Sequence, residues 1–139
     1  MVAATSLEGT LAFCRMAIRS GTIFNGGALV ALIPVTANAY FKISELAPPE
    51  RIIHTKVIDG LVSAATVFVI GLVISGFSSF IAFFGEFYYT NFHLTNNCAF
   101  KGKARMILFA GAAAVLLSLI LFAVGSYTAI HSFQNASGL

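Results

Sequence analysis

Residues 60–85 read GLVSAATVFVIGLVISGFSSFIAFFG and contain no Asp, Glu, Lys or Arg. A helix of about 20 mostly apolar residues is long enough to cross the hydrocarbon core of a bilayer. Within the stretch, Gly71, Ser75, Ser78, Ala82 and Gly85 follow one another at spacings of four and three residues. The stretch therefore predicts a membrane-spanning helix with small side chains along one face.

Two further intervals, 20–41 and 106–139, also lack acidic and basic residues. The chain is 58% hydrophobic and 9% charged, whereas soluble domains are about 25% charged. Backbone groups in lipid must be satisfied within the spanning structure, and no segment alternates with period two, which favours helices over a barrel. The sequence predicts an all-α integral membrane protein with three long transmembrane helices.

The whole chain, 1–139, is expected to form a single membrane domain. We expect helices at about 5–43, 49–90 and 103–133, with residues 90–103 as an irregular loop. Thr5 and Glu8 fit a capping box at the first helix, and prolines 48 and 49 suit the first turn of the second. At 1.5 Å per residue, at least the first two helices are longer than the ~30 Å hydrocarbon core and extend beyond it.

The basic residues predict an orientation. With the N-terminus in the cytoplasm and the C-terminus outside, more Lys and Arg lie inside than outside, as the positive-inside rule requires. The five cytoplasmic residues would set topology or contact lipid headgroups, and they are Arg15, Arg19, Lys101, Lys103 and Arg105. Three basic charges beside a membrane end are more typical of lipid contact than of nucleic-acid binding, so no nucleic-acid partner is expected. The first helix lacks a cleavage site and is expected to be retained.

Small residues form a heptad-like seam on each expected helix, and such seams let backbones approach closely in lipid. One interpretation is that the seams close a three-helix monomer. The other is that at least one seam faces a second copy, and we expect a homo-oligomer because three such lines exceed what one cluster needs. The packing residues predicted here are Gly26, Gly27, Gly71, Ser75, Ser78, Ala82, Gly111, Ser118 and Gly125. The first helix carries a further line through Ser20, Gly27, Ala31, Pro34 and Asn38.

Polar residues within the charge-free intervals include Asn25, Asn38 and Ser79. These side chains either bridge helices by hydrogen bonds or line a narrow aqueous path, for which charge is not required. Asn25 precedes the pair Gly26 and Gly27, which favours a close helix crossing with Asn25 as an interhelical hydrogen bonder. A functional break or constriction at the same place is the alternative.

Several classes of function are disfavoured. No ionisable residue lies in the middle of a span, which argues against a proton relay or a charge-coupled transporter. His54, His93 and His131 are scattered, and neither a zinc-protease motif nor a phosphate-binding loop occurs. His93 and Cys98 alone are too few ligands for a zinc site. We expect a non-enzymatic protein without a cofactor or metal.

The stretch AIRSGTIFNGGALVAL, within residues 14–33, resembles a segment of short uncharacterised bacterial multi-spanning membrane proteins. Some of these resemble membrane effectors of anti-phage or toxin systems. The resemblance implies the bacterial inner membrane and a self-assembling effector that forms a pore or perturbs the bilayer. The alternative is a structural or accessory subunit of a larger complex, with a protein partner at the cytoplasmic helix ends.

Overall fold

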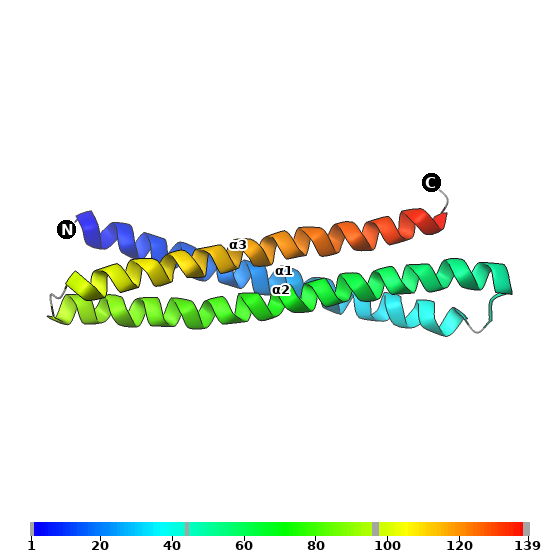
Figure 1. The fold of residues 1–139 in the computed structure, drawn as a ribbon, viewed down its shortest axis with the longest axis horizontal. Helices are drawn as coiled ribbons and strands as arrows, with labels where there is room; N and C mark the ends of the chain where they lie inside the picture. The colour runs from blue at the N-terminus through cyan, green and yellow to red at the C-terminus, as the bar shows by residue number, and fades with distance from the viewer. Residues whose placement is uncertain (1, 44, 96–97, 138–139) are drawn as a thin grey trace.

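The computed structural model describes residues 2–43, 45–95 and 98–137, and these ranges form three long helices (Figure 1). Helix α1 spans Val2–Ile43, α2 spans Pro48–Thr95 and α3 spans Cys98–Ser137. Glu50 in the first turn of α2 and Lys42 in the last turn of α1 carry the charges that complement the helix dipoles. The prediction of an all-helical fold is confirmed.

The helices contain 42, 48 and 40 residues. At 1.5 Å per residue they are about 63, 72 and 60 Å long, roughly twice the ~30 Å hydrocarbon core. The segments Arg15–Ile43, Glu50–Thr95 and Ala99–Gln134 are long and apolar enough to cross a membrane. Their length and composition fit a membrane-integral protein.

The α2–α3 connection is shorter than the sequence predicts. Residues 90–95 continue α2 and residues 98–103 begin α3, so the expected loop over 90–103 is wrong for its described residues; positions 96 and 97 lie outside them. Packing between the two helix ends explains the difference, because the rings of Tyr88 and Phe100 lie 6.1 Å apart and Lys103 Nζ lies 6.0 Å from the Tyr88 ring. Similarly, α1 begins at Val2 and not at Thr5.

Helices α2 and α3 are antiparallel and lie side by side along most of their length (Figure 1). Their contact residues recur at spacings of three and four, the period of near-parallel helix packing. Small residues on one helix accept large ones from the other: a Cβ at Gly125 would lie 2.8 Å from Phe68 Cε1, and one at Gly85 would lie 3.3 Å from Leu108 Cδ2. The buried residues of this seam include Leu61, Ala64, Phe68, Gly71, Ser75, Ser78 and Gly85 on α2, and Ala104, Gly111, Val115, Ser118 and Gly125 on α3.

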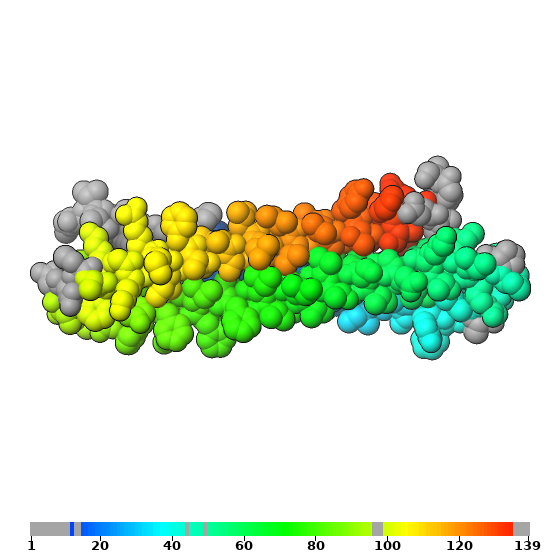
Figure 2. Space-filling model, viewed as in Figure 1, coloured from blue at the N-terminus to red at the C-terminus, as the bar shows by residue number. Residues whose placement is uncertain are grey.

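Helix α1 crosses the α2–α3 pair obliquely and contacts α2 more than α3 (Figure 1). Its apolar side chains are largely uncovered, with Val30 71% and Phe41 73% exposed. On the face shown in Figure 2, side chains of α2 and α3 fill the space between these two helices along the rod. The fold is therefore a tight hairpin of two helices with a third helix laid across it.

Replacing Gly125 with Leu should destabilise the hairpin, because the new side chain would overlap the buried ring of Phe68. We expect a loss of about 1–3 kcal/mol, the usual range for overpacking, measured as loss of helicity during denaturant titration in detergent. Gly76→Leu is the matched control, since no atom lies within 4 Å of a Cβ built at Gly76. Equal stability of the two variants would contradict the α2–α3 packing.

Candidate functional site

The three helices meet at a polar centre, formed by Gly21, Thr22 and Asn25 of α1, Gly71 and Ser75 of α2, and Ser118 of α3. Asn25, Ser75 and Ser118 are fully buried, with exposed fractions of 0%. Gly21 permits the approach of α1, because a Cβ there would lie 3.1 Å from Ser75 Oγ and 3.2 Å from Ser118 Oγ. At the crossing point, α1 thus contributes a glycine, and each of the two neighbouring helices contributes a serine hydroxyl.

Asn25 links all three helices through Ser118. Its Nδ2 donates to Ser118 Oγ at 3.1 Å, to the Ser118 carbonyl at 3.3 Å and to the carbonyl of Gly21 in its own helix at 2.9 Å. Ser118 Oγ in turn donates to the Gly71 carbonyl at 2.9 Å. These are interhelical bonds of the kind that the sequence favours for Asn25, and they join α1 to α3 and α3 to α2.

A second set of bonds joins α1 directly to α2. Ser75 Oγ donates to the Ile18 carbonyl at 3.1 Å and lies 2.9 Å from Thr22 Oγ1. Ser78 Oγ donates to the Ser75 carbonyl at 2.6 Å. The buried hydroxyls are therefore bonded within the protein. At this level the described side chains form a hydrogen-bonded polar contact between the three helices.

Asn25 Oδ1 is the exception: among the described residues it is the buried side-chain oxygen or nitrogen atom without a hydrogen-bond partner. A Cβ built at Gly71 would lie only 2.4 Å from this oxygen. The Asn25 amide thus occupies space that any side chain at position 71 would take. Glycine at position 71 is a steric requirement of the polar centre.

The predicted packing residues separate into two groups. Gly71, Ser75, Ser78, Gly111, Ser118 and Gly125 are buried and face the interior of the chain. Gly26 and Ala82 are half-buried, Asn38 and Ser79 are exposed, and Gly27 is exposed with no atom within 4 Å of a Cβ built there. The seams of α2 and α3 therefore close the monomer, whereas the line along α1 remains uncovered.

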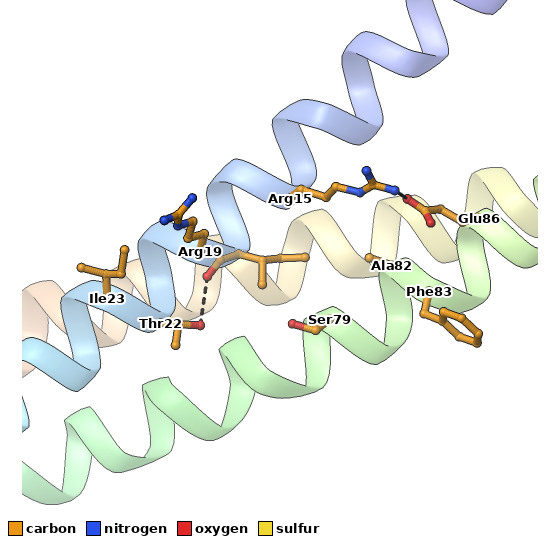
Figure 3. Close-up of a pocket in the computed structure, with 9 residues that line it drawn as sticks. Arg15, Arg19, Thr22, Ile23, Ser79, Ala82, Phe83 and Glu86 are labelled. Carbon is orange, nitrogen blue, oxygen red and sulfur yellow. Dashed lines mark hydrogen bonds and ion pairs between the residues drawn. The ribbon is translucent and has the colours of Figure 1, made fainter.

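A groove lies between the N-terminal half of α1 and the C-terminal half of α2 (Figure 3). This α1–α2 groove has a volume of about 660 Å³. Arg15 forms an ion pair with Glu86 across it, and the two side chains are 69% and 33% exposed. The lining residues are Arg15, Ile18, Arg19, Thr22, Ile23, Ser79, Ala82, Phe83 and Glu86.

The sequence did not identify the Arg15–Glu86 pair, although it predicted that Arg15 lies on the cytoplasmic side. The available indication was that Glu86 directly follows the charge-free interval 60–85 and Arg15 shortly precedes the interval 20–41, on helices that pack antiparallel. An exposed pair of this kind contributes little to stability in water, about 0–1 kcal/mol. The ion pair neutralises the charge of one of the two arginines in the groove.

The five basic residues predicted to set topology separate into two groups: Lys101, Lys103 and Arg105 lie near the start of α3, whereas Arg15 and Arg19 lie further along the rod, in the α1–α2 groove. Lys101, Lys103 and Arg105 are exposed, and Lys101 Nζ lies 5.9 Å from the Phe92 ring. Within the described residues, no group of three His, Cys, Asp or Glu side chains comes close enough together to hold a metal ion. Comparison of the chain with protein-family models, curated proteins and solved structures gives no match.

Replacing Gly71 with Ala should displace Asn25 and weaken its bonds to Ser118. We expect a loss of about 1–2 kcal/mol, near the upper end for interhelical hydrogen bonds in membranes, in the same denaturant titration. The loss should be at least halved in an Asn25→Ala background, because contacting residues are energetically coupled. Gly76→Ala serves as the uncoupled control, since no atom lies within 4 Å of a Cβ built at Gly76. Equal effects of Gly71→Ala in both backgrounds would show that Asn25 does not depend on Gly71.

Proposed function

We propose that the protein is a small non-enzymatic integral membrane protein that self-assembles through the outer face of α1. The observation that carries this proposal is the exposure of Gly27, Ala31, Pro34 and Asn38 along α1, while the equivalent seams of α2 and α3 are used inside the chain. With Ser20, which is half-buried, these residues form the outer α1 line. Asn25 and Gly27 differ by about 200° around a helix of 3.6 residues per turn, so the line faces away from the polar centre.

The position of the polar centre along the helices supports membrane insertion, because it is compatible with a level near the middle of the bilayer. Gly71 and Ser75 lie at the middle of the charge-free interval 60–85. Arg15 is ten residues from Asn25, or about 15 Å along α1, which is half of the ~30 Å hydrocarbon core. The Arg15–Glu86 pair then lies at the boundary, on the side that the basic residues assign to the cytoplasm.

Self-assembly follows from the forces available in lipid. Apolar side chains gain nothing by leaving lipid for another helix, so association depends on close backbone contact and on polar groups. The outer α1 line offers both, since Gly27 and Ala31 are small and Asn38 carries an amide. A second copy of the chain, meeting the same line, would bury residues that are otherwise in contact with lipid.

The proposed role is that of a bacterial inner-membrane effector that forms a pore or perturbs the bilayer, with the N-terminus in the cytoplasm and the C-terminus outside. Hydrogen bonds close the polar centre within one chain, so any aqueous path would form between copies. The resemblance of residues 14–33 to membrane-effector proteins supports the same role.

A structural or accessory subunit of a larger complex is the second candidate. The helix lengths favour it, because helices of about 60 Å or more leave their ends outside a ~30 Å core. The α2–α3 end presents Tyr88, Phe92, Lys101 and Lys103 together. This aromatic and basic cluster is the surface on which a cytoplasmic protein partner would dock.

Gly27→Leu should convert the assembled protein to smaller species, because a branched side chain at position 27 separates the two backbones. We expect at least a tenfold weaker association, about 1.4 kcal/mol, which is within the range of overpacking effects. Size-exclusion chromatography with light scattering in mild detergent measures the mass, and dye release from vesicles measures permeabilisation. Gly76→Leu, on an exposed face of α2, is the matched control.

The two candidates give different results in this experiment. A monomeric wild-type protein that becomes ordered only with a partner would exclude self-assembly. A stable homomer that releases no dye would retain the assembly and exclude the pore. A Gly27→Leu variant of unchanged mass would place the interface elsewhere than the outer α1 line.

A further inference from the structure

The α1–α2 groove holds a cation and a hydroxyl that have no partner among the described residues. Arg15 is paired with Glu86, whereas Arg19 forms neither an ion pair nor a hydrogen bond with any described residue. Figure 3 shows Arg15 extending toward Glu86 and Arg19 turned away from that pair. With two arginines and one glutamate among its lining residues, the groove carries a net charge of +1.

Ser79 differs from most exposed hydroxyl residues of the bundle. Ser63, Thr66 and Thr128 each donate to the carbonyl four residues earlier, which satisfies the hydroxyl within its own helix. Ser79 makes no such bond with any described residue, and its side chain points into the groove toward Thr22 (Figure 3). Its O–H is available as a donor to a molecule in the groove.

The depth of Arg19 in the membrane favours its pairing with an anion. This inference rests on the proposed membrane insertion. Arg19 is six residues from Asn25, or about 9 Å along α1, and so starts inside the hydrocarbon core. A charge at that depth is costly unless it is paired or its side chain extends toward the headgroups. The groove beside Arg19 gives a headgroup phosphate access to it.

The depths of the lining residues fit the two ends of a phospholipid. Ser75 meets α1 at Ile18 and Thr22, so Ser79, one turn nearer the membrane boundary on α2, lies on the boundary side of Arg19, whereas Ile23 lies deeper than Arg19. A phospholipid has its phosphate outermost, its ester carbonyls deeper and its acyl chains deepest. The volume of about 660 Å³ is within the range of pockets that bind small molecules.

We propose that the α1–α2 groove binds one anionic phospholipid. Arg19 pairs with the headgroup phosphate, Ser79 donates to a phosphate oxygen, and the first part of an acyl chain lies against Ile23. The net positive charge of the groove selects an anionic headgroup over a zwitterionic one. Glu86 opposes binding, because it neutralises Arg15 and adds a negative charge beside the phosphate.

The test is native mass spectrometry of the detergent-purified full chain, titrated with phosphatidylglycerol or with phosphatidylcholine. The wild type should retain one phosphatidylglycerol in preference to phosphatidylcholine. Arg19→Gln should weaken phosphatidylglycerol binding about fivefold, the effect of one basic residue at an anionic membrane surface. Arg51→Gln makes the same charge change on an exposed part of α2, far along the helix from the groove, and should leave binding unchanged.

Two further variants separate a lipid site from a general charge effect. Ser79→Leu keeps the charge but fills the groove, so it should also weaken binding. Glu86→Gln releases Arg15 and should strengthen binding, which loss of structure would not do. Circular dichroism checks that each variant keeps the helicity of the wild type.

Binding that falls equally in Arg19→Gln and Arg51→Gln, or that shows no preference for phosphatidylglycerol, would overturn the proposal. The proposal would also be overturned if binding of inorganic phosphate depended on Arg19 and binding of the lipid did not. Alkaline carbonate extraction of the membranes tests insertion separately. A chain that resists extraction but shows no lipid preference would refute the groove site alone, and a chain that is extracted would refute insertion itself.

Discussion

Close contact at the polar centre is the interaction on which the rest of the arrangement depends. Lipid does not drive apolar helices together, so a three-helix unit needs small residues and satisfied polar groups where its backbones meet. Gly21 and Gly71 provide the space, and Asn25 and Ser118 provide bonds that connect three helices. Without this contact, α1 would lose its interhelical hydrogen bonds to the α2–α3 hairpin at the polar centre.

The oblique path of α1 follows from the same contact. Helices α2 and α3 share a long seam of alternating small and large residues, so they stay together along their length. Helix α1 approaches closely at Gly21 and Asn25 and presents the outer α1 line to the surroundings. Toward its N-terminus, the divergence from α2 produces the α1–α2 groove, which the Arg15–Glu86 pair spans. One crossing point therefore determines both of the surfaces proposed to act in assembly and in lipid binding.

The two surfaces proposed on α1 adjoin each other. Arg19 and Gly27 are eight residues apart, which places them about 80° from each other around the axis, and Ile23 of the groove lies one turn from Gly27. A copy of the chain on the outer α1 line would therefore lie beside the groove, and a lipid held there would lie next to the interface between copies.

Local patterns in the sequence determined the helical class, the three apolar segments and the residues of the α2 and α3 seams, because charge-free length and small-residue spacing are properties of one helix at a time. They failed at residues 90–95 and 98–103, which continue α2 and begin α3 where Tyr88 packs against Phe100. They also could not decide which seam closes the monomer, since the spacing is the same whether the partner helix belongs to the same chain or to another. Only the tertiary structure brought Asn25 to Ser118 and Arg15 to Glu86, because such contacts join residues far apart in the chain and depend on helix crossing and register.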